Sequence, residues 1–202
     1  MAKPKTKAEL FLFYSNTLKP LYAAIQSENE LPPEVLFEIH AALDHLSREY
    51  TYGEAEDEVV EKAYSHFKRA CLDVFKLTVK RTIDHYNELA RLDLSVLDNG
   101  QFEAEMRSLI SKIKDGARKA RCNEGVPNQG ATNDSAFDLW EPVYTQCDEF
   151  DMKFYRHQQL DWARKKMSWF SWRSLVVGAL LGGVISWGIS RGLDWLFPAT
   201  GI

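Results

Sequence analysis

The feature that most constrains this chain of 202 residues is the stretch from Ser174 to Ser190, which contains no charged side chain. As a helix its seventeen residues would span about 25 Å, close to the thickness of the hydrocarbon core of a bilayer. Trp172 and Trp195 flank the stretch, where indole rings favour the membrane interface. The pattern predicts one transmembrane helix within residues 173–192. The alternative is a buried helix of a soluble domain, because seventeen residues is at the short limit for a membrane span.

The flanking charges predict the orientation of this helix. Basic side chains are concentrated before it, whereas only Arg191 follows it closely, just ahead of Asp194. The basic residues on the N-terminal side are Arg164, Lys165, Lys166 and Arg173. Because the cytoplasmic flank of a membrane helix carries the excess of Lys and Arg, we expect a single-pass protein with a cytoplasmic N-terminal domain. Residues 193–202 would then form a short extracytoplasmic tail.

Small side chains recur every four residues within the predicted membrane helix. They are Gly178, Gly182, Ser186 and Ser190, and this spacing places them in one stripe. A stripe of small residues lets membrane helices approach closely, so it predicts a homo-oligomerisation face. In a larger ring the same stripe could line a narrow pore. The alternative is that glycine is simply common in membrane helices.

The remaining sequence predicts an all-α protein, because apolar residues recur with helical spacing and alternating β-branched runs are absent. We expect a cytoplasmic bundle of four or five helices, with the last helix continuing into the membrane helix. The expected helices are 6–27, 33–50, 55–92 and 102–121, with a capping box at Thr6 and Glu9 and a kink or break at Pro20. The expected divisions are a bundle at 1–121, a flexible loop at 122–135 and a stalk helix at 136–172.

Composition and motifs exclude several classes of function. The net charge of −4 gives no general nucleic-acid footprint. Cys71, Cys122 and Cys147 are far apart and odd in number, which suits a reducing compartment and forms no metal motif. No phosphate-binding loop, dinucleotide fingerprint or nucleophile elbow occurs in the chain, so we predict neither a cofactor nor a metal site.

Two segments carry a family resemblance: EIHAALDHLSREY, from Glu38 to Tyr50, and SHFKRACLDVFKL, from Ser65 to Leu77. Together they resemble the paired helices of HEPN domains, and the resemblance covers roughly residues 35–92. It implies a helical bundle that often dimerises. It also implies a link to RNA cleavage, toxin–antitoxin pairs and anti-phage defence, in which some members carry a membrane segment. On this resemblance we expect the chain in the bacterial inner membrane.

The resemblance also implies candidate residues, although the ribonuclease signature of the family is altered here. That signature is Arg, four to six residues, then His, and His40 stands where the Arg is expected before His45. If the chain cleaves RNA, His40, His45 and Arg69 are the candidate residues. The alternative for Asp44, His45, His66 and Arg69 is a structural polar network between two packed helices.

A second group of candidates lies further along the same predicted helix. Lys76, Lys80, Arg81 and His85 form a basic strip that could bind a nucleotide phosphate or RNA. The alternative is a solvated helix face. His40 and His45 are five residues apart and therefore do not share a helix face as a metal-binding pair would.

These features favour a non-enzymatic effector of bacterial immunity that oligomerises through its membrane helix and permeabilises or depolarises the inner membrane. The expected partners are the lipid bilayer, further copies of the chain, and a defence-system protein, nucleotide signal or RNA. Two alternatives remain open: a membrane-tethered ribonuclease of the HEPN type, and a non-catalytic adaptor that holds another protein at the membrane.

Overall fold

The computed structural model describes residues 3–26, 31–94, 97–124, 133–157 and 160. Over these ranges the chain forms helices and turns without a strand, which confirms the all-α class for the part described. Within the same ranges no helix combines the length and the apolarity needed to cross a bilayer. The predicted membrane helix at 173–192 and the tail at 193–202 lie outside the described residues.

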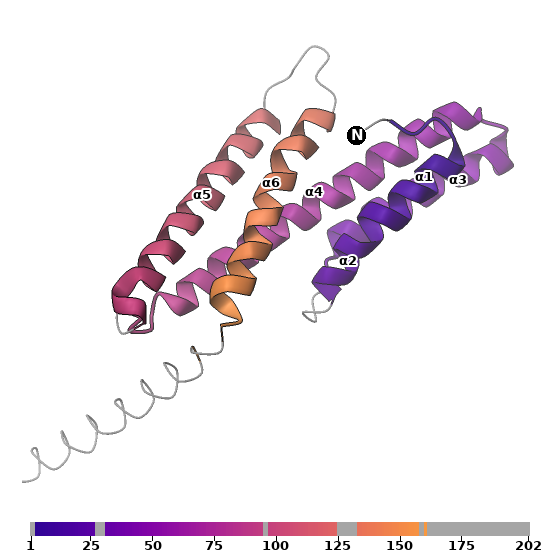
Figure 1. Cartoon of the computed structure of the whole chain (residues 1–202). Helices are drawn as coiled ribbons and strands as arrows, with labels where there is room; N and C mark the ends of the chain where they lie inside the picture. Colours follow the sequence, from indigo (N-terminus) through magenta and orange to yellow (C-terminus); the bar gives the residue numbers. More distant parts are fainter. Residues whose placement is uncertain (1–2, 27–30, 95–96, 125–132, 158–159, 161–202) are drawn as a thin grey trace, which may run out of the picture.

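The bundle is organised around one long central helix, as Figure 1 shows. The helices are α1 (Lys7–Phe13), α2 (Lys19–Gln26), α3 (Pro33–Tyr52), α4 (Glu56–Leu89), α5 (Gln101–Glu124) and α6 (Asn133–Phe150). At 34 residues, α4 extends over about 51 Å and buries apolar side chains along its whole length. Its first half packs against α3 and the N-terminal helices, and its second half packs against α5 and α6. The predicted helix at 55–92 is therefore confirmed, and it joins both halves of the bundle.

The N-terminal helix passes through Pro20 without a break. Its start is capped as predicted, because the backbone N–H of Glu9 donates to Oγ1 of Thr6. The Glu9 carboxylate accepts from the backbone N–H of Lys5, not from that of Thr6, so the capping box is displaced by one residue. Between α1 and α2 lies a π-helical segment, η1 (Tyr14–Leu18). Its wider turn makes room for the proline ring, which would otherwise collide with the carbonyl four residues earlier.

Helix α3 buries a narrower stripe than the sequence pattern predicts. It runs to Tyr52, two residues beyond the predicted range of 33–50, and the φ of 70° at the following Gly53 is the left-handed conformation that closes many helices. Leu36 and Leu43 have the helical spacing of core residues, yet they are 44% and 50% exposed. The physical reason is that α3 packs mainly on α4, so only the line through Val35, Ala42 and Leu46 is buried.

The C-terminal part of the bundle corrects two predictions. Residues 136–150, predicted to begin a stalk, belong to α6, which packs between α4 and α5 and buries Trp140 completely. The helix passes through Pro142 and continues as the π-helical segment η3 (Asp151–Tyr155). It then ends at Arg156, so an uninterrupted helix from 136 to 172 is wrong. Helix α5 also extends to Glu124, which shortens the predicted loop at 122–135; residues 125–132 lie outside the described ranges.

Gly116 allows α5 and α6 to approach closely. A Cβ atom at this position would lie 2.8 Å from Cγ2 of Val143. Although alanine is favoured over glycine in a helix by about 1 kcal/mol, we expect Gly116→Ala to destabilise the bundle by about 1–2 kcal/mol through this collision. Adding Val143→Ala should restore part of the loss, and a double-mutant cycle in urea would measure the coupling. If the effects of the two substitutions on the free energy of unfolding are strictly additive, the close approach of α5 and α6 at Gly116 is contradicted.

Candidate functional site

The first polar cluster joins α3 and α4, and we call it the histidine cluster. It consists of Glu38 and His45 from α3 with His66 and Arg69 from α4. Glu38 and His45 are seven residues apart and therefore share the face of α3 that packs on α4. A Glu38 carboxylate oxygen lies 2.6 Å from Nδ1 of His66, and Nε of Arg69 lies 3.8 Å from the same carboxylate. The rings of His45 and His66 stack with their centroids 5.0 Å apart.

The geometry assigns different chemical roles to the two imidazoles. Because an ionised carboxylate can only accept, Nδ1 of His66 carries the proton that is donated to Glu38. Its Nε2 then holds a lone pair when the ring is neutral. The pKa of His45 is lowered from its usual value, first by burial and then by the charges of His66 and Arg48. The cluster therefore holds one oriented imidazole beside one that resists protonation.

The structure separates the candidates that the sequence grouped around His45. His40 is exposed on α3 and lies outside the histidine cluster. Asp44, expected in the polar network, instead pairs with Arg48 at 3.1 Å on the surface of the same helix. Glu38 orients His66, although the sequence reasoning did not select it. The sequence feature that could have identified Glu38 is its spacing of seven residues from His45, which places the two side chains on one helix face.

His45 has a buried Nδ1 with no hydrogen-bond partner among the described residues. We therefore expect His45→Leu to raise the free energy of unfolding by about 1 kcal/mol at pH 7, because an unsatisfied buried polar atom is removed. The folded-state pKa of His45 is depressed, so the unfolded chain binds more protons below about pH 6.5, and stability falls as the pH falls. In urea titrations, His45→Leu should reduce the loss of stability that accompanies acidification, whereas His40→Leu should leave that loss unchanged. A less stable His45→Leu protein at pH 7 would contradict the assignment.

The second polar cluster lies between α4 and η3, and we call it the junction cluster. It consists of Arg81 and His85 from α4 with Asp151 and Tyr155 from η3. Asp151 is only 4% exposed; one carboxylate oxygen lies 2.9 Å from Nδ1 of His85 and the other 3.5 Å from a guanidinium nitrogen of Arg81. The Tyr155 ring stacks on His85 at 3.6 Å, and its hydroxyl donates to Glu88. Hydrogen bonds and opposite charges thus satisfy the buried carboxylate.

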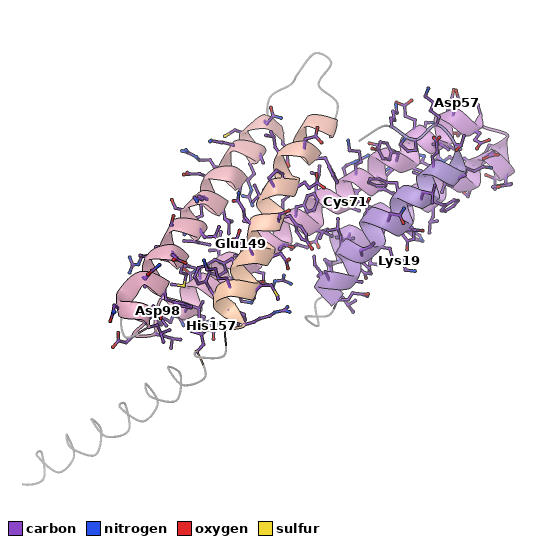
Figure 2. All side chains as sticks on the ribbon, in the orientation of Figure 1. Lys19, Asp57, Cys71, Asp98, Glu149 and His157 are labelled. Atoms are coloured by element: carbon purple, nitrogen blue, oxygen red, sulfur yellow. The ribbon has the colours of Figure 1, made fainter. Side chains whose placement is uncertain are left out.

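The junction cluster lies at η3, the last helical segment that the structure describes. His157 follows two residues after Tyr155 and contacts the Phe102 ring at the start of α5, at the lower end of the bundle in Figure 2. The sequence feature that could have identified the cluster is an acidic residue at a core position of a helix. Asp151 occupies such a position, between the apolar residues Phe150 and Phe154. Asp151 was not among the predicted site residues.

The predicted basic strip does not converge on one site. Arg81 and His85 face Asp151 in the junction cluster. Lys76 pairs instead with Glu124 at the end of α5, at 3.1 Å, and Lys80 is exposed. Among the residues that the structure describes, no three His, Cys, Asp or Glu side chains are grouped to hold a metal ion. Gly178, Gly182, Ser186 and Ser190 lie outside the described ranges.

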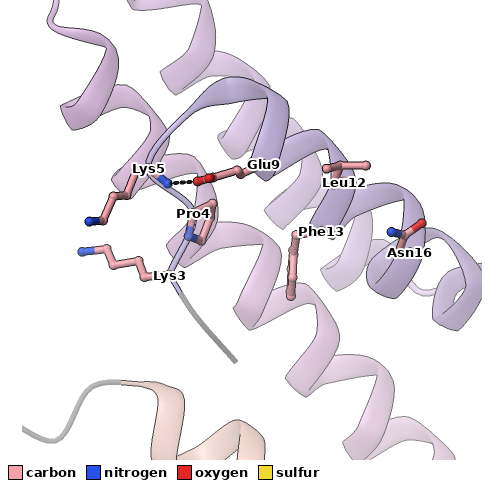
Figure 3. A pocket seen from close by; sticks show the side chains of 7 residues that line it. All are labelled: Lys3, Pro4, Lys5, Glu9, Leu12, Phe13 and Asn16. Carbon is pink, nitrogen blue, oxygen red and sulfur yellow. Dashed lines mark hydrogen bonds between the residues drawn. The ribbon is translucent and has the colours of Figure 1, made fainter.

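A hollow of about 480 Å³ lies beside the N-terminal segment (Figure 3). It is lined by Lys3, Pro4, Lys5, Glu9, Leu12, Phe13 and Asn16. The hollow is open to solvent, and its carboxylate is already held by the backbone of Lys5. Lys3 pairs with Glu61 on α4. The arrangement fixes the N-terminal segment to the bundle and offers no convergent polar groups for a ligand.

Comparison of the chain with protein-family models, with curated protein sequences and with solved structures gives no match.

Proposed function

We propose that this protein is a membrane-anchored effector of bacterial immunity. Its helical bundle lies in the cytoplasm, its C-terminal helix crosses the inner membrane, and association of these helices permeabilises or depolarises that membrane. The link to immunity rests on the resemblance of residues 35–92 to HEPN domains. The remainder of the proposal rests on the physical character of the C-terminal segment and of the bundle.

The observation that carries the proposal is the uncharged stretch Ser174–Ser190 with its stripe of small residues. Its length, its tryptophans and the basic side chains before it agree on one membrane span with a cytoplasmic bundle. Gly178 and Gly182 allow two such helices to pack closely. No Asp, Glu, Lys or Arg interrupts the stretch, which disfavours a transporter or a proton relay.

The junction cluster supports a mechanical connection between the bundle and this segment. Asp151 is buried against Arg81 and His85 of α4, so the last part of the described bundle is fixed to the central helix. Thirteen residues lie between Leu160 and Ser174. A partner or signal that binds the bundle and rearranges α4 would therefore change the direction in which the chain leaves the bundle.

The test is ion flux through liposomes that contain the purified full-length chain, together with its oligomeric state from chemical crosslinking. The proposal expects a defined multimer and leakage of a potassium gradient at a rate that rises with the protein-to-lipid ratio. A monomeric protein that stays in the membrane and does not leak would refute permeabilisation. A protein recovered entirely from the aqueous phase would refute the membrane anchor.

A second candidate function, a membrane-tethered ribonuclease, is favoured by the stacked rings of the histidine cluster. Neutral His45, in keeping with its lowered pKa, would take the proton of an RNA 2′-hydroxyl as that oxygen attacks phosphorus. The bond from phosphorus to the 5′-oxygen then breaks, and the His66 imidazolium, held by the Glu38 carboxylate, would supply the proton to that oxygen. Arg69 is placed to face the phosphate charge. The products would be a 2′,3′-cyclic phosphate and a 5′-hydroxyl.

Cleavage of a fluorescent RNA by the full-length protein in detergent tests this candidate. His66→Gln should lower the rate by about 100-fold or more, the usual contribution of a general acid or base. His40→Gln is the matched control, because it changes an exposed histidine of α3 outside the cluster and should keep the parent rate. No cleavage by the parent protein, or equal rates in both variants, would exclude the assignment.

A further inference from the structure

Helix α5 presents a cationic outer surface that neither proposed function uses. Arg107, Lys114, Arg118 and Arg121 are exposed and follow each other at intervals of seven, four and three residues. They therefore form one line along the helix, about 21 Å long. We call these four residues the α5 basic face. From Arg107 to Arg121 the sequence holds six basic residues and one acidic residue, a net charge of +5 in a chain of net charge −4.

The other side chains of the bundle neutralise this surface only in part. Arg107 pairs with Glu103 one turn earlier, and Arg118 approaches Asp115 at 3.7 Å while its side chain remains 75% exposed. Lys114 lies over the ring of Tyr86 on α4, a contact that adds no negative charge. Arg121 forms no ion pair with any described residue. The α5 basic face therefore keeps a net positive field, carried mainly by Lys114, Arg118 and Arg121, that is available to a partner.

The composition of α5 discriminates between anionic partners. Proteins that bind single-stranded nucleic acid combine cations with aromatic rings on which bases stack. The only aromatic residue of α5 is Phe102, which is buried. No large apolar side chain of α5 is exposed either, and the structure describes every residue of this helix. A cationic surface without stacking or inserting side chains suits the headgroup layer of an anionic membrane, where the attraction is electrostatic.

We propose that the α5 basic face docks on anionic lipid headgroups of the membrane that anchors the chain. The inference rests on the proposed membrane anchor and adds a second contact to it. The first turn of α5 lies beside η3, the last helical segment that the structure describes, because Phe102 contacts both Phe154 and His157. The α5 basic face therefore begins close to η3, the described segment nearest in sequence to the predicted anchor.

Cys122 supplies a probe at the end of this face. It is exposed and free, whereas Cys71 and Cys147 are buried, and burial raises their thiol pKa to about 12 and about 11. A fluorophore on Cys122 of the full-length protein reports its distance from vesicles that carry a headgroup quencher. We expect at least about twofold stronger quenching when about one-third of the lipid is phosphatidylglycerol than when all lipid is zwitterionic. About 0.5 M salt, where the Debye length is about 4 Å, should abolish the difference.

A charge-matched pair of variants assigns the contact. Lys114→Gln, Arg118→Gln and Arg121→Gln together should reduce quenching in anionic vesicles to the zwitterionic level. Lys5→Gln, Lys19→Gln and Arg91→Gln remove the same charge from other exposed positions and should leave the difference intact. Equal quenching in both lipids, or the same loss in both triple variants, would overturn the inference. So would a response of the probe to an RNA oligonucleotide in place of anionic vesicles.

The same samples separate this inference from the membrane anchor. Flotation with zwitterionic vesicles in high salt depends on the anchor alone, so its loss would refute the anchor. If a protein that fails to float with zwitterionic vesicles in high salt still floats with anionic vesicles at low salt, the α5 basic face binds lipid without the anchor. If it floats with neither, both proposals fail. If the protein is anchored but its quenching does not depend on the lipid charge, only the docking of the α5 basic face is refuted.

Discussion

Replacing Gly178 and Gly182 together by leucine should abolish ion leakage from liposomes that contain the full-length protein. Two leucine side chains in the small-residue stripe would hold neighbouring helices apart and remove their close packing. Because every 1.4 kcal/mol of lost association free energy weakens binding tenfold, we expect leakage to fall by at least about tenfold and the multimer to disappear from crosslinking. Leucine is more apolar than glycine, so the variant should still insert.

The matched control moves the same change to the next face of the helix. Ala179→Leu with Gly183→Leu has the same spacing and adds a similar volume about 100° away around the helix axis. This control should keep both the multimer and the leakage. Full leakage in the Gly178 and Gly182 variant would show that the small-residue stripe is not the association face. An equal loss of leakage in both double variants would point to a general effect of added volume.

Replacing Asp151 by alanine should cause a large loss of stability in the bundle. It leaves His85 and the Arg81 guanidinium facing each other without the carboxylate that they share. Removing one partner of a buried ionic group costs about 3–5 kcal/mol, which corresponds to a fall of about 10 °C in Tm for a chain of this size. Thermal unfolding in detergent, followed by circular dichroism, measures the change.

Two further variants isolate the buried charge. Asp151→Asn keeps an acceptor for Nδ1 of His85 but removes the charge that faces Arg81, so it should lose roughly half as much stability. Asp148→Ala removes an exposed acid from α6, three residues earlier, and should change stability by less than about 0.5 kcal/mol. A mild effect of Asp151→Ala, similar to that of Asp148→Ala, would show that the junction cluster does not hold η3 to α4.

Helical periodicity was sufficient to predict the major helices, because apolar spacing and end signals are local. The expected helix at 55–92 corresponds to α4, and those at 33–50 and 102–121 correspond to α3 and α5 within a few residues. Two exposed leucines of α3 show the limit of this reasoning. Periodicity identifies an apolar side of a helix, but the number of neighbouring helices determines how much of that side is covered.

The candidate site was predictable only in part for the same reason. Sequence reasoning selected His45, Arg69, Arg81 and His85, and all four lie in polar clusters. It placed Asp44 in the network and missed Glu38 and Asp151 as partners. Asp151 lies 66 residues from His85 along the chain, and no local pattern reports a pairing over that separation.

The sequence by itself determined the helical class, the length of the central helix and the uncharged segment at 174–190, since each depends on residue order within a few turns. The membrane span at that segment stays a prediction. Only the tertiary structure decided that α6 belongs to the bundle, that His45 stacks on His66, and that Asp151 is buried against α4. These outcomes depend on which helix faces come together, because burial and long-range pairing are properties of the packed chain and not of any single segment.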